Sequence, residues 1–299
     1  MAVESCGDFY ALPEDCIANA LSLTSPKDAS RLSLVASTFR SAAQSDAVWE
    51  RFLPSDYRQI ISRCIDGPDS LLVKSKKDLF LYLCEHPILI DSGLKSFSLE
   101  KWSGKKCFML SARDLYIVWG DTAQYWAWIS LPESRFPEVA ELLDVCWFEI
   151  RGKINMNMLS PATNYAAYLV FTCKSRTHGF EHQPAEACVG VSGHEAEKRT
   201  VCLDPDGAQR QRYQIVPRRI GLLYHRLTRL HGQQQDNVPP IEQNTQYPKP
   251  RDNGWMEVEL GEFFVKEGQD GDLEISLMEV KGGNWKSGII VQGIEIRPK

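Results

Sequence analysis

The feature of this sequence that most constrains its fold is a change in hydrophobic period near Gly93. Before that point, Ile17 and Leu21 stand four residues apart, on one face of a helix within residues 12–53. Helical spacing returns between about residues 56 and 84, where the segment SKKDLFLYLCEHP closes on a proline. We therefore predict that the N-terminal part of the chain is helical.

Beyond Gly93 the apolar residues alternate instead. In YAAYLVF, residues 165–171, both alternating sets are apolar, which is typical of a strand inside a sandwich. Met256, Val258 and Leu260 alternate with glutamates, which indicates a strand with one face in water. GDLEISLMEV and SGIIVQGIEIRP follow between glycine-containing turns, so the expected body is an all-β sandwich of jelly-roll type.

The predicted fold class is thus α+β and multidomain. We place a helical head at residues 1–55, a helical linker at 56–93 and the β-sandwich at 94–299. The sandwich carries a long polar insertion at about 205–250, which its turn-rich composition predicts to be a loop.

That insertion is locally basic. It has no acidic residue from position 207 to 235 but contains six arginines: Arg210, Arg212, Arg218, Arg219, Arg226 and Arg229. Leucines spaced between positions 222 and 230 predict one short amphipathic helix within it. A solvated insertion is the favoured interpretation, and a nuclear-import or anion-binding patch is the alternative.

Composition narrows the environment and the partners. A net charge of −5 argues against general nucleic-acid binding, and no apolar run approaches the ~20 residues of a membrane span. The N-terminus has no basic region of the kind that begins a secretory signal. The nine cysteines form no C-x-x-C pair, which favours reduced thiols. We expect a protein of the cytoplasm and nucleus.

No stretch of the sequence assembles the parts of an active site. Residues 190–194, GVSGH, lack the final glycine of a nucleophile elbow, and GGNWKSG at 282–288 lacks the spacing of a phosphate loop. His178 and His182 stand four apart without a third metal ligand nearby. We therefore expect a non-enzyme with no metal and no cofactor.

The aromatic stretch VWGDTAQYWAW, residues 118–128, raises the main functional question. Trp119, Tyr125, Trp126 and Trp128 surround a polar turn that includes Asp121. A strand is expected to enter this turn and a second to leave it at Tyr125. The aromatic rings either fill the core, which the pattern alone favours, or stand out to stack on a sugar.

The head LPEDCIANALSLTSPKDASRLSLVASTFRSAAQSDAVWERF resembles an F-box. The resemblance rests on residues at the motif's characteristic positions: Leu12, Pro13, Ile17, Leu21, Asp28, Leu32, Val35, Phe39 and Trp49. Phe39 departs from the tryptophan of many members but keeps an aromatic ring. The resemblance implies docking on a Skp-type adaptor, with these residues as candidate contacts: Leu12, Pro13, Ile17, Leu21, Leu32 and Val35.

The body resembles the plant phloem protein 2 lectins, typified by the tobacco agglutinin. The matching stretches include SARDLYIVWGDTAQYWAW, FPEVAELLDVCWFEIRGKI and NWKSGIIVQGIEIRPK. In those lectins two aromatic residues that match Trp119 and Trp126 bind glycans containing N-acetylglucosamine. The candidate carbohydrate-binding residues are therefore Trp119, Trp126, Tyr125 and Asp121. A partly exposed Trp126 ring and a Trp128 in the core are expected.

Together the two resemblances imply the substrate-recognition subunit of a cullin–RING (SCF) ubiquitin ligase. Its partners would be the Skp-type adaptor, the cullin–RING ligase and a target protein, with an N-glycosylated protein as one candidate. Two alternatives stay open. The chain is either a carbohydrate-binding stress protein outside any ligase, or a receptor for a protein surface in which the tryptophans are structural.

Overall fold

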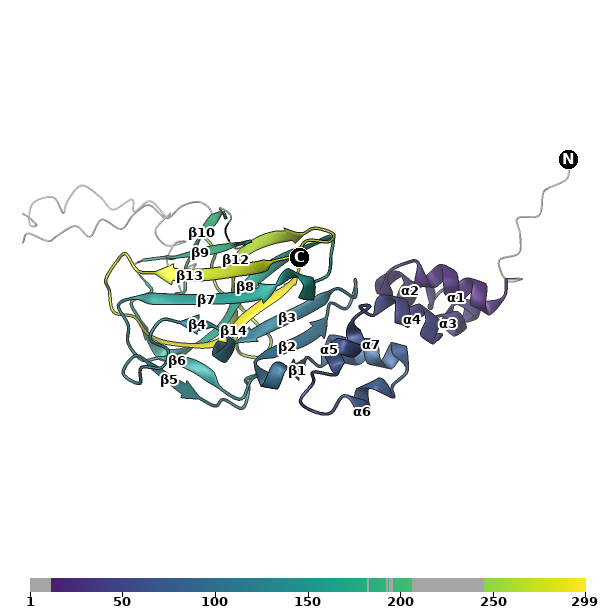
Figure 1. The fold of residues 1–299 in the computed structure, drawn as a ribbon, viewed down its shortest axis with the longest axis horizontal. Helices are drawn as coiled ribbons and strands as arrows, with labels where there is room; N and C mark the ends of the chain where they lie inside the picture. Colours follow the sequence, from purple (N-terminus) through teal and green to yellow (C-terminus); the bar gives the residue numbers. More distant parts are fainter. Residues whose placement is uncertain (1–11, 182, 192, 194–195, 206–244) are drawn as a thin grey trace, which may run out of the picture.

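The computed structural model describes residues 12–299 except 182, 192, 194–195 and 206–244 (Figure 1). Four short helices form the N-terminal helical unit: α1 (Glu14–Ser22), α2 (Pro26–Leu32), α3 (Ser37–Ala42) and α4 (Asp46–Phe52). Ser25 caps α2, because its Oγ accepts a hydrogen bond from the Asp28 N–H at 3.1 Å. Ser45 caps α4 in the same way at 3.3 Å.

Three further helices join this unit to the sandwich: α5 (Tyr57–Ile61), α6 (Asp69–Leu72) and α7 (Lys76–Glu85). They are more than a linker, because α7 packs against both α4 and the sheet strand β2 (Lys95–Leu99). The ring of Trp49 lies 5.2 Å from Phe80 of α7, between ring centroids. One hydrophobic core therefore runs unbroken from Ile17 in α1 to Ile296 in the last strand.

The junction with the sandwich is close-packed. Gly104, between β2 and β3, has φ +70°, and a Cβ there would lie 2.7 Å from the carbonyl oxygen of Phe52. Only glycine lets this turn meet the end of α4. Beside it, the nearly buried Lys106 ammonium lies 3.0 Å from the Asp56 carboxylate. The helical unit is thus held against the sheet by packing and by an ion pair.

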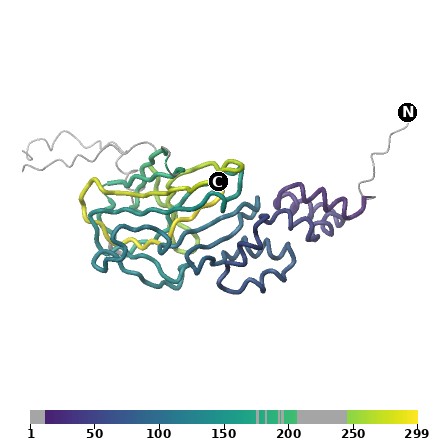
Figure 2. Tube along the Cα trace, in the orientation of Figure 1, coloured from purple at the N-terminus to yellow at the C-terminus, as the bar shows by residue number. Residues whose placement is uncertain are grey.

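Two antiparallel sheets face each other in the body (Figure 2). The nine-stranded sheet contains β1 (Ile88–Ile90), β2, β3 (Lys106–Ser111), β5 (Trp126–Ile129), β6 (Val139–Leu142), β8 (Thr163–His178), β11 (Lys249–Pro250), β12 (Met256–Val265) and β14 (Ser287–Pro298). The five-stranded sheet has the order β10 (Lys198–Val201), β9 (Ala185–Val191), β13 (Asp272–Glu279), β7 (Phe148–Asn155) and β4 (Tyr116–Ile117). Single 3₁₀ turns lie at Asp91–Gly93, Ala112–Asp114 and Met156–Met158.

The predicted fold class is confirmed: helices are followed by a sandwich-like body of antiparallel sheets. β8 lies inside the nine-stranded sheet between β14 and β12, and most of its apolar residues are buried, on both faces. One face packs on the five-stranded sheet, and a second apolar cluster around Trp255 covers the other. The boundaries 1–55, 56–93 and 94–299 remain predictions; the first strand already begins at Ile88.

Several sequence predictions lie partly or wholly outside the described residues. They are the arginines and the short helix of the 205–250 insertion, together with His182 and His194. The eight described cysteines are free thiols, and burial raises the pKa of Cys84 to about 12. None of the described helices has both the length and the apolar character that a membrane crossing requires.

A buried carboxylate on β14 is held by three arginines. Glu295 accepts hydrogen bonds from Arg251 at 2.6 Å, Arg297 at 2.7 Å and Arg135 at 3.4 Å. Burial alone would raise the pKa of Glu295. The hydrogen bond from Arg251 and the three positive charges outweigh burial, and they hold this pKa below its usual range.

This arrangement predicts an acid-sensitive contribution to stability. Because the folded-state pKa of Glu295 is depressed, its contribution is fully present above the unfolded value of about 4.3 and is lost as pH falls through the folded value. We expect Glu295→Gln to lower the melting temperature at pH 7 and to flatten its fall below about pH 4. Melting curves of both proteins from pH 3 to 7 check this. Two parallel curves would contradict it.

Candidate functional sites at the two ends of the molecule

The 118–125 loop connects the two sheets and does not close a hairpin. β4, before the loop, pairs with β7 in the five-stranded sheet, whereas β5, after it, pairs with β6 in the nine-stranded sheet. Trp119 takes a left-handed backbone conformation with φ +58°, which is uncommon for a residue with a bulky side chain. The loop therefore closes the gap between two sheet edges.

Trp126 lies in the core, so the expectation of a partly exposed ring is wrong. Its side chain is 2% exposed, and its indole N–H donates to the Val118 carbonyl at 3.2 Å. The ring lies 6.4 Å from that of Phe148 on the facing sheet, between centroids. As the first residue of β5, Trp126 fills the space that the crossing loop encloses.

Trp128 is expected in the core, but its side chain is only partly buried, at the margin of the core. Its indole N–H donates to the Gly120 carbonyl at 3.0 Å, and the Arg113 guanidinium lies 3.6 Å from the ring centroid. Trp126 and Trp128 share a face, as the alternation predicts, and both indoles hold the loop backbone. Their degrees of burial are the reverse of the expectation.

Trp119 is the exposed tryptophan of the loop. Its side chain is 42% exposed and leans on Tyr125, with ring centroids 5.1 Å apart at 37°. Asp121 is exposed on the same loop. The Tyr125 carbonyl accepts from the Leu143 N–H at 2.9 Å, which ties the loop to its neighbour. Three of the four predicted carbohydrate-binding residues thus share one loop surface.

Two more exposed tryptophans, Trp147 and Trp285, lie on loops joined to this region. Val145 and Lys286 exchange two backbone hydrogen bonds, of 3.0 and 2.8 Å. The fully buried Lys286 ammonium pairs with the Glu279 carboxylate and donates to the Cys146 carbonyl at 3.2 Å. An ion pair in the core therefore supports both loops.

At the other end of the molecule, the predicted adaptor contacts divide into two groups. Ile17 and Leu21 are buried and join the core of the helical unit. Leu32 is partly buried against it. The remaining three predicted contacts are exposed: Leu12, Pro13 and Val35, with Val35 at 71%. A helix this short must bury its one apolar stripe to fold, so only the exposed group is free to meet a partner.

Leu34, which the sequence analysis did not assign, is 77% exposed beside Val35. Both follow the last turn of α2, where the chain leaves the helix. Leu34 and Val35 are adjacent exposed apolar residues, and neither belongs to the described hydrophobic core.

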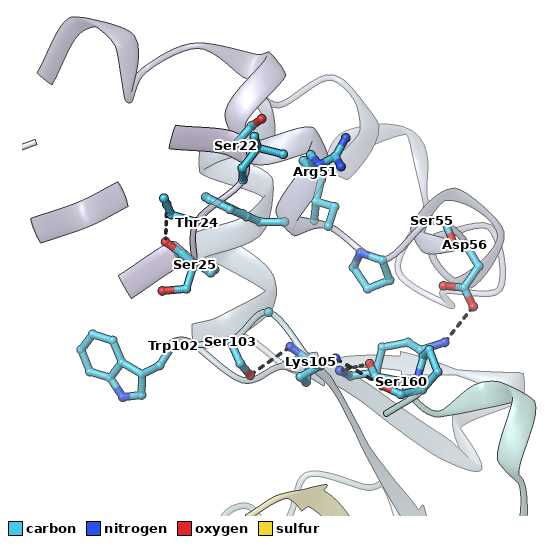
Figure 3. Close-up of a pocket in the computed structure, with 18 residues that line it drawn as sticks. Ser22, Thr24, Ser25, Arg51, Ser55, Asp56, Trp102, Ser103, Lys105 and Ser160 are labelled. Atoms are coloured by element: carbon cyan, nitrogen blue, oxygen red, sulfur yellow. Dashed lines mark hydrogen bonds and ion pairs between the residues drawn. The ribbon is translucent and has the colours of Figure 1, made fainter. Parts of the chain in front are cut away.

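A cleft of about 550 Å³ lies where the helical unit meets the sandwich (Figure 3). Its walls are the 22–26 and 51–56 segments on one side and the 102–106 turn with Ser160 on the other. Trp102 stands at its edge, with the Lys27 ammonium 5.8 Å from the ring centroid. The Asp56–Lys106 ion pair closes one side. None of the predicted site residues lines it.

Among the described residues, no three potential metal-ligating side chains gather in one place. The Nδ1 atom of His178 lies 3.1 Å from Oε1 of Glu181.

Comparisons with known proteins match both the helical unit and the sandwich to known families. The Phloem protein 2 family profile matches residues 105–298, and the F-box domain profile matches residues 9–51. F-box protein At2g02240 of Arabidopsis thaliana is 48% identical over 97% of this chain and 80% of its own length. F-box protein PP2-B1 of the same plant is 44% identical over 100% of this chain and 92% of its own length.

The chain belongs to the plant F-box proteins that carry a phloem protein 2 domain. The solved structure of TmCBM61 in complex with β-1,4-galactotriose covers 62% of this chain and 87% of that one, at 9% identity and a TM-score of 0.28. Similarity this low carries no inference about a ligand.

The F-box and the phloem protein 2 domain thus contribute separate candidate surfaces. The F-box offers Leu12, Pro13, Leu34 and Val35. The phloem protein 2 domain offers Trp119 on the 118–125 loop, with Trp147 and Trp285 on the connected loops. Sequence reasoning missed the last two because each stands in a connection between strands, where no alternation marks its exposure.

Proposed function

We propose that the chain is the substrate-recognition subunit of an SCF ubiquitin ligase. F-box proteins generally act as non-catalytic substrate adaptors, and an F-box implies binding to a Skp-type adaptor. The observation that carries the proposal is the exposed pair Leu34–Val35, which lies outside the described hydrophobic core of the helical unit. Burying such a side chain against a partner contributes about 1.5–3 kcal/mol.

The target would bind at the far end of the phloem protein 2 domain, remote from α1–α4 (Figure 1). Trp119 offers a ring face that can stack on the C–H face of a sugar, backed by Tyr125. Asp121 supplies an acceptor for a sugar hydroxyl. A glycoprotein carrying N-acetylglucosamine is the target class that this loop fits, with Trp126 supporting the loop from below.

One observation favours a second candidate, recognition of a protein surface. Trp119, Trp147 and Trp285 are all exposed on connected loops, and tryptophan is enriched where protein interfaces concentrate their binding energy. A glycan array on the whole chain with its adaptor separates the two: binding to N-acetylglucosamine-containing glycans supports the first, and a silent array favours the second.

The mechanism in either case is proximity. The chain breaks no bond; it holds the target beside the ubiquitin-charged enzyme and so raises the effective concentration of the target's lysines. We place this activity in the cytoplasm and nucleus.

The adaptor half of the proposal predicts a selective loss. Leu34→Ser with Val35→Ser should weaken co-purification of a Skp-type adaptor by more than about tenfold. Both substitutions remove apolar surface that the adaptor would otherwise bury in the complex. The melting temperature should stay near that of the wild type, since neither side chain packs in the core.

Val73→Ser is the matched control, because Val73 is 84% exposed but follows α6, outside the residues that match the F-box. It should leave co-purification unchanged. Full adaptor binding by the double variant, or an equal loss in the Val73 variant, would refute the assignment of this surface.

A further inference from the structure

Two serines of this chain are followed by proline, Ser25 and Ser160, and no threonine is. The structure separates the two. Ser160 is 7% exposed, and its Oγ accepts a hydrogen bond from the Lys106 N–H at 3.0 Å. Ser25 is only partly buried and lines the cleft between the helical unit and the sandwich (Figure 3). Of the two serines, Ser25 is therefore the one that an enzyme can reach.

The backbone at Ser25 already has the form of an extended substrate. Its φ of −103° and ψ of 159° lie in the extended region, which a following proline favours. Pro26 has no N–H, so an enzyme pocket that receives it needs no hydrogen-bond acceptor. A pocket without an acceptor would leave the N–H of any other residue unsatisfied. A protein kinase can select a serine followed by proline in this way.

The helix that Ser25 begins is weakly anchored. α2 has seven residues, of which only Pro26 and Ala29 are buried. α4 has the same length but buries Val48, Trp49 and Phe52. A helix this short depends on its packing, and segments with few buried contacts open most readily. The Ser25 segment can therefore leave its place to enter an active site while α4 stays folded.

The Ser25 hydroxyl belongs to a capping box. It donates to Oδ2 of Asp28 at 2.7 Å and accepts from the Asp28 N–H at 3.1 Å. A phosphate ester at this oxygen has no proton to donate, and the phosphate carries about −1.5 to −2 charges at neutral pH. It would face the Asp28 carboxylate at close range, and like charges repel. Phosphate at Ser25 therefore breaks the cap of α2.

The loss of this cap reaches the exposed pair Leu34–Val35. The Leu34 N–H donates to the Arg31 carbonyl at 3.1 Å, and the Val35 N–H donates to the Leu32 carbonyl at 2.9 Å. Both carbonyls belong to the last turn of α2. The position of the pair thus depends on an intact α2.

We propose that Ser25 is a phosphorylation site of a proline-directed protein kinase, and that phosphate there withdraws the pair Leu34–Val35 from the adaptor. In the transfer, Ser25 Oγ attacks the terminal phosphorus of a nucleoside triphosphate. An Oγ–P bond forms, the bond to the nucleoside diphosphate breaks, and the hydroxyl proton passes to the kinase. The effect on the adaptor rests on the proposed ligase role, whereas the modification itself does not.

The modification is tested by incubating the full chain with a proline-directed kinase and ATP and mapping phosphate by mass spectrometry. Phosphate is expected on Ser25 and not on the buried Ser160. Pro26→Ala keeps the Ser25 hydroxyl and should lower phosphate incorporation by at least about tenfold. An unmodified Ser25 in the wild-type chain, or undiminished incorporation in Pro26→Ala, would overturn the site.

Ser75 is the matched internal control. Its Oγ donates to Asp78 at 2.7 Å and accepts from the Asp78 N–H at 3.1 Å, as in the Ser25 cap, but Lys76 follows it. It should stay unmodified. Phosphate on Ser75 to the same extent as on Ser25 would show that the capping position and not the proline is recognised, which contradicts the proposal.

The loosening of α2 is tested by hydrogen exchange, which needs no adaptor. Amides of residues 27–32 should exchange faster in the phosphorylated chain than in the unmodified chain. The increase should be smaller in Asp28→Asn, which removes the repelling charge. Unchanged or slower exchange in the wild type would mean that cations lining the cleft, such as Arg51 or Lys105, hold the phosphate, and would overturn the proposed effect.

Co-purification of a Skp-type adaptor with the two forms completes the test. The phosphorylated chain should bind at least about fivefold more weakly than the unmodified chain. Phosphorylation of Asp28→Asn should weaken binding less. Equal binding by both wild-type forms overturns the regulatory effect. Binding by neither form refutes the ligase role instead, and phosphate mapping and hydrogen exchange then decide the modification.

Discussion

Trp126→Ala should lower the free energy of unfolding by about 3–5 kcal/mol, the range for truncating a buried aromatic residue. The indole fills the space between the sheets and holds the Val118 carbonyl, so its loss opens a cavity and frees the loop. Denaturant unfolding curves give the value. Trp119→Ala, in the adjoining 118–125 loop and 42% exposed, should cost far less.

The same two variants distinguish a residue that supports the loop from a residue that contacts a glycan. Trp119→Ala should remove binding to glycans containing N-acetylglucosamine while the protein stays folded, whereas any loss in Trp126→Ala should follow its loss of structure. A Trp126→Ala protein that is as stable as Trp119→Ala would show that the ring is not part of the core.

Lys286→Met should be comparably damaging, at about 3–5 kcal/mol, because it leaves the Glu279 carboxylate buried without its counter-charge. Adding Glu279→Leu to it should restore much of the stability, since a pair of well-packed apolar side chains often replaces a buried ion pair at little cost. Thermal and denaturant unfolding of the single and double variants measure this recovery.

Lys281→Met is the control from the same loop. Lys281 pairs with Glu186 at the surface, where water screens the interaction, so no measurable change is expected. A double variant no more stable than Lys286→Met alone would contradict the assignment of the loss to an unpaired carboxylate.

Local patterns were sufficient to predict much of the fold. Ser25 and Asp28 mark the start of α2 in the sequence, and the structure confirms the cap. The two apolar faces of residues 165–171 predict an interior strand, and β8 is one. These features depend on neighbours within a few positions, which a sequence displays directly.

The burial of the tryptophans could not be read in this way. The alternation places Trp126 and Trp128 on one face, as observed, but it does not say which face another sheet covers or how deeply. That depends on Phe148, which comes from the facing sheet. Likewise Ile17 and Leu21 have the same spacing whether a helix buries them in its own unit or offers them to a partner.

The unbroken core between the F-box and the phloem protein 2 domain fixes the distance between the exposed F-box surface and the 118–125 loop. Trp49 packs on Phe80 and Gly104 lies against Phe52, so the described residues of this junction leave no unpacked hinge about which a bound target could swing toward the ligase. In the proposed role, a target lysine then receives ubiquitin because of its distance from the adaptor and not because of the residues around it. Two targets bound at the same point of the phloem protein 2 domain would be ubiquitinated at the same distance from that point, whatever their local sequence.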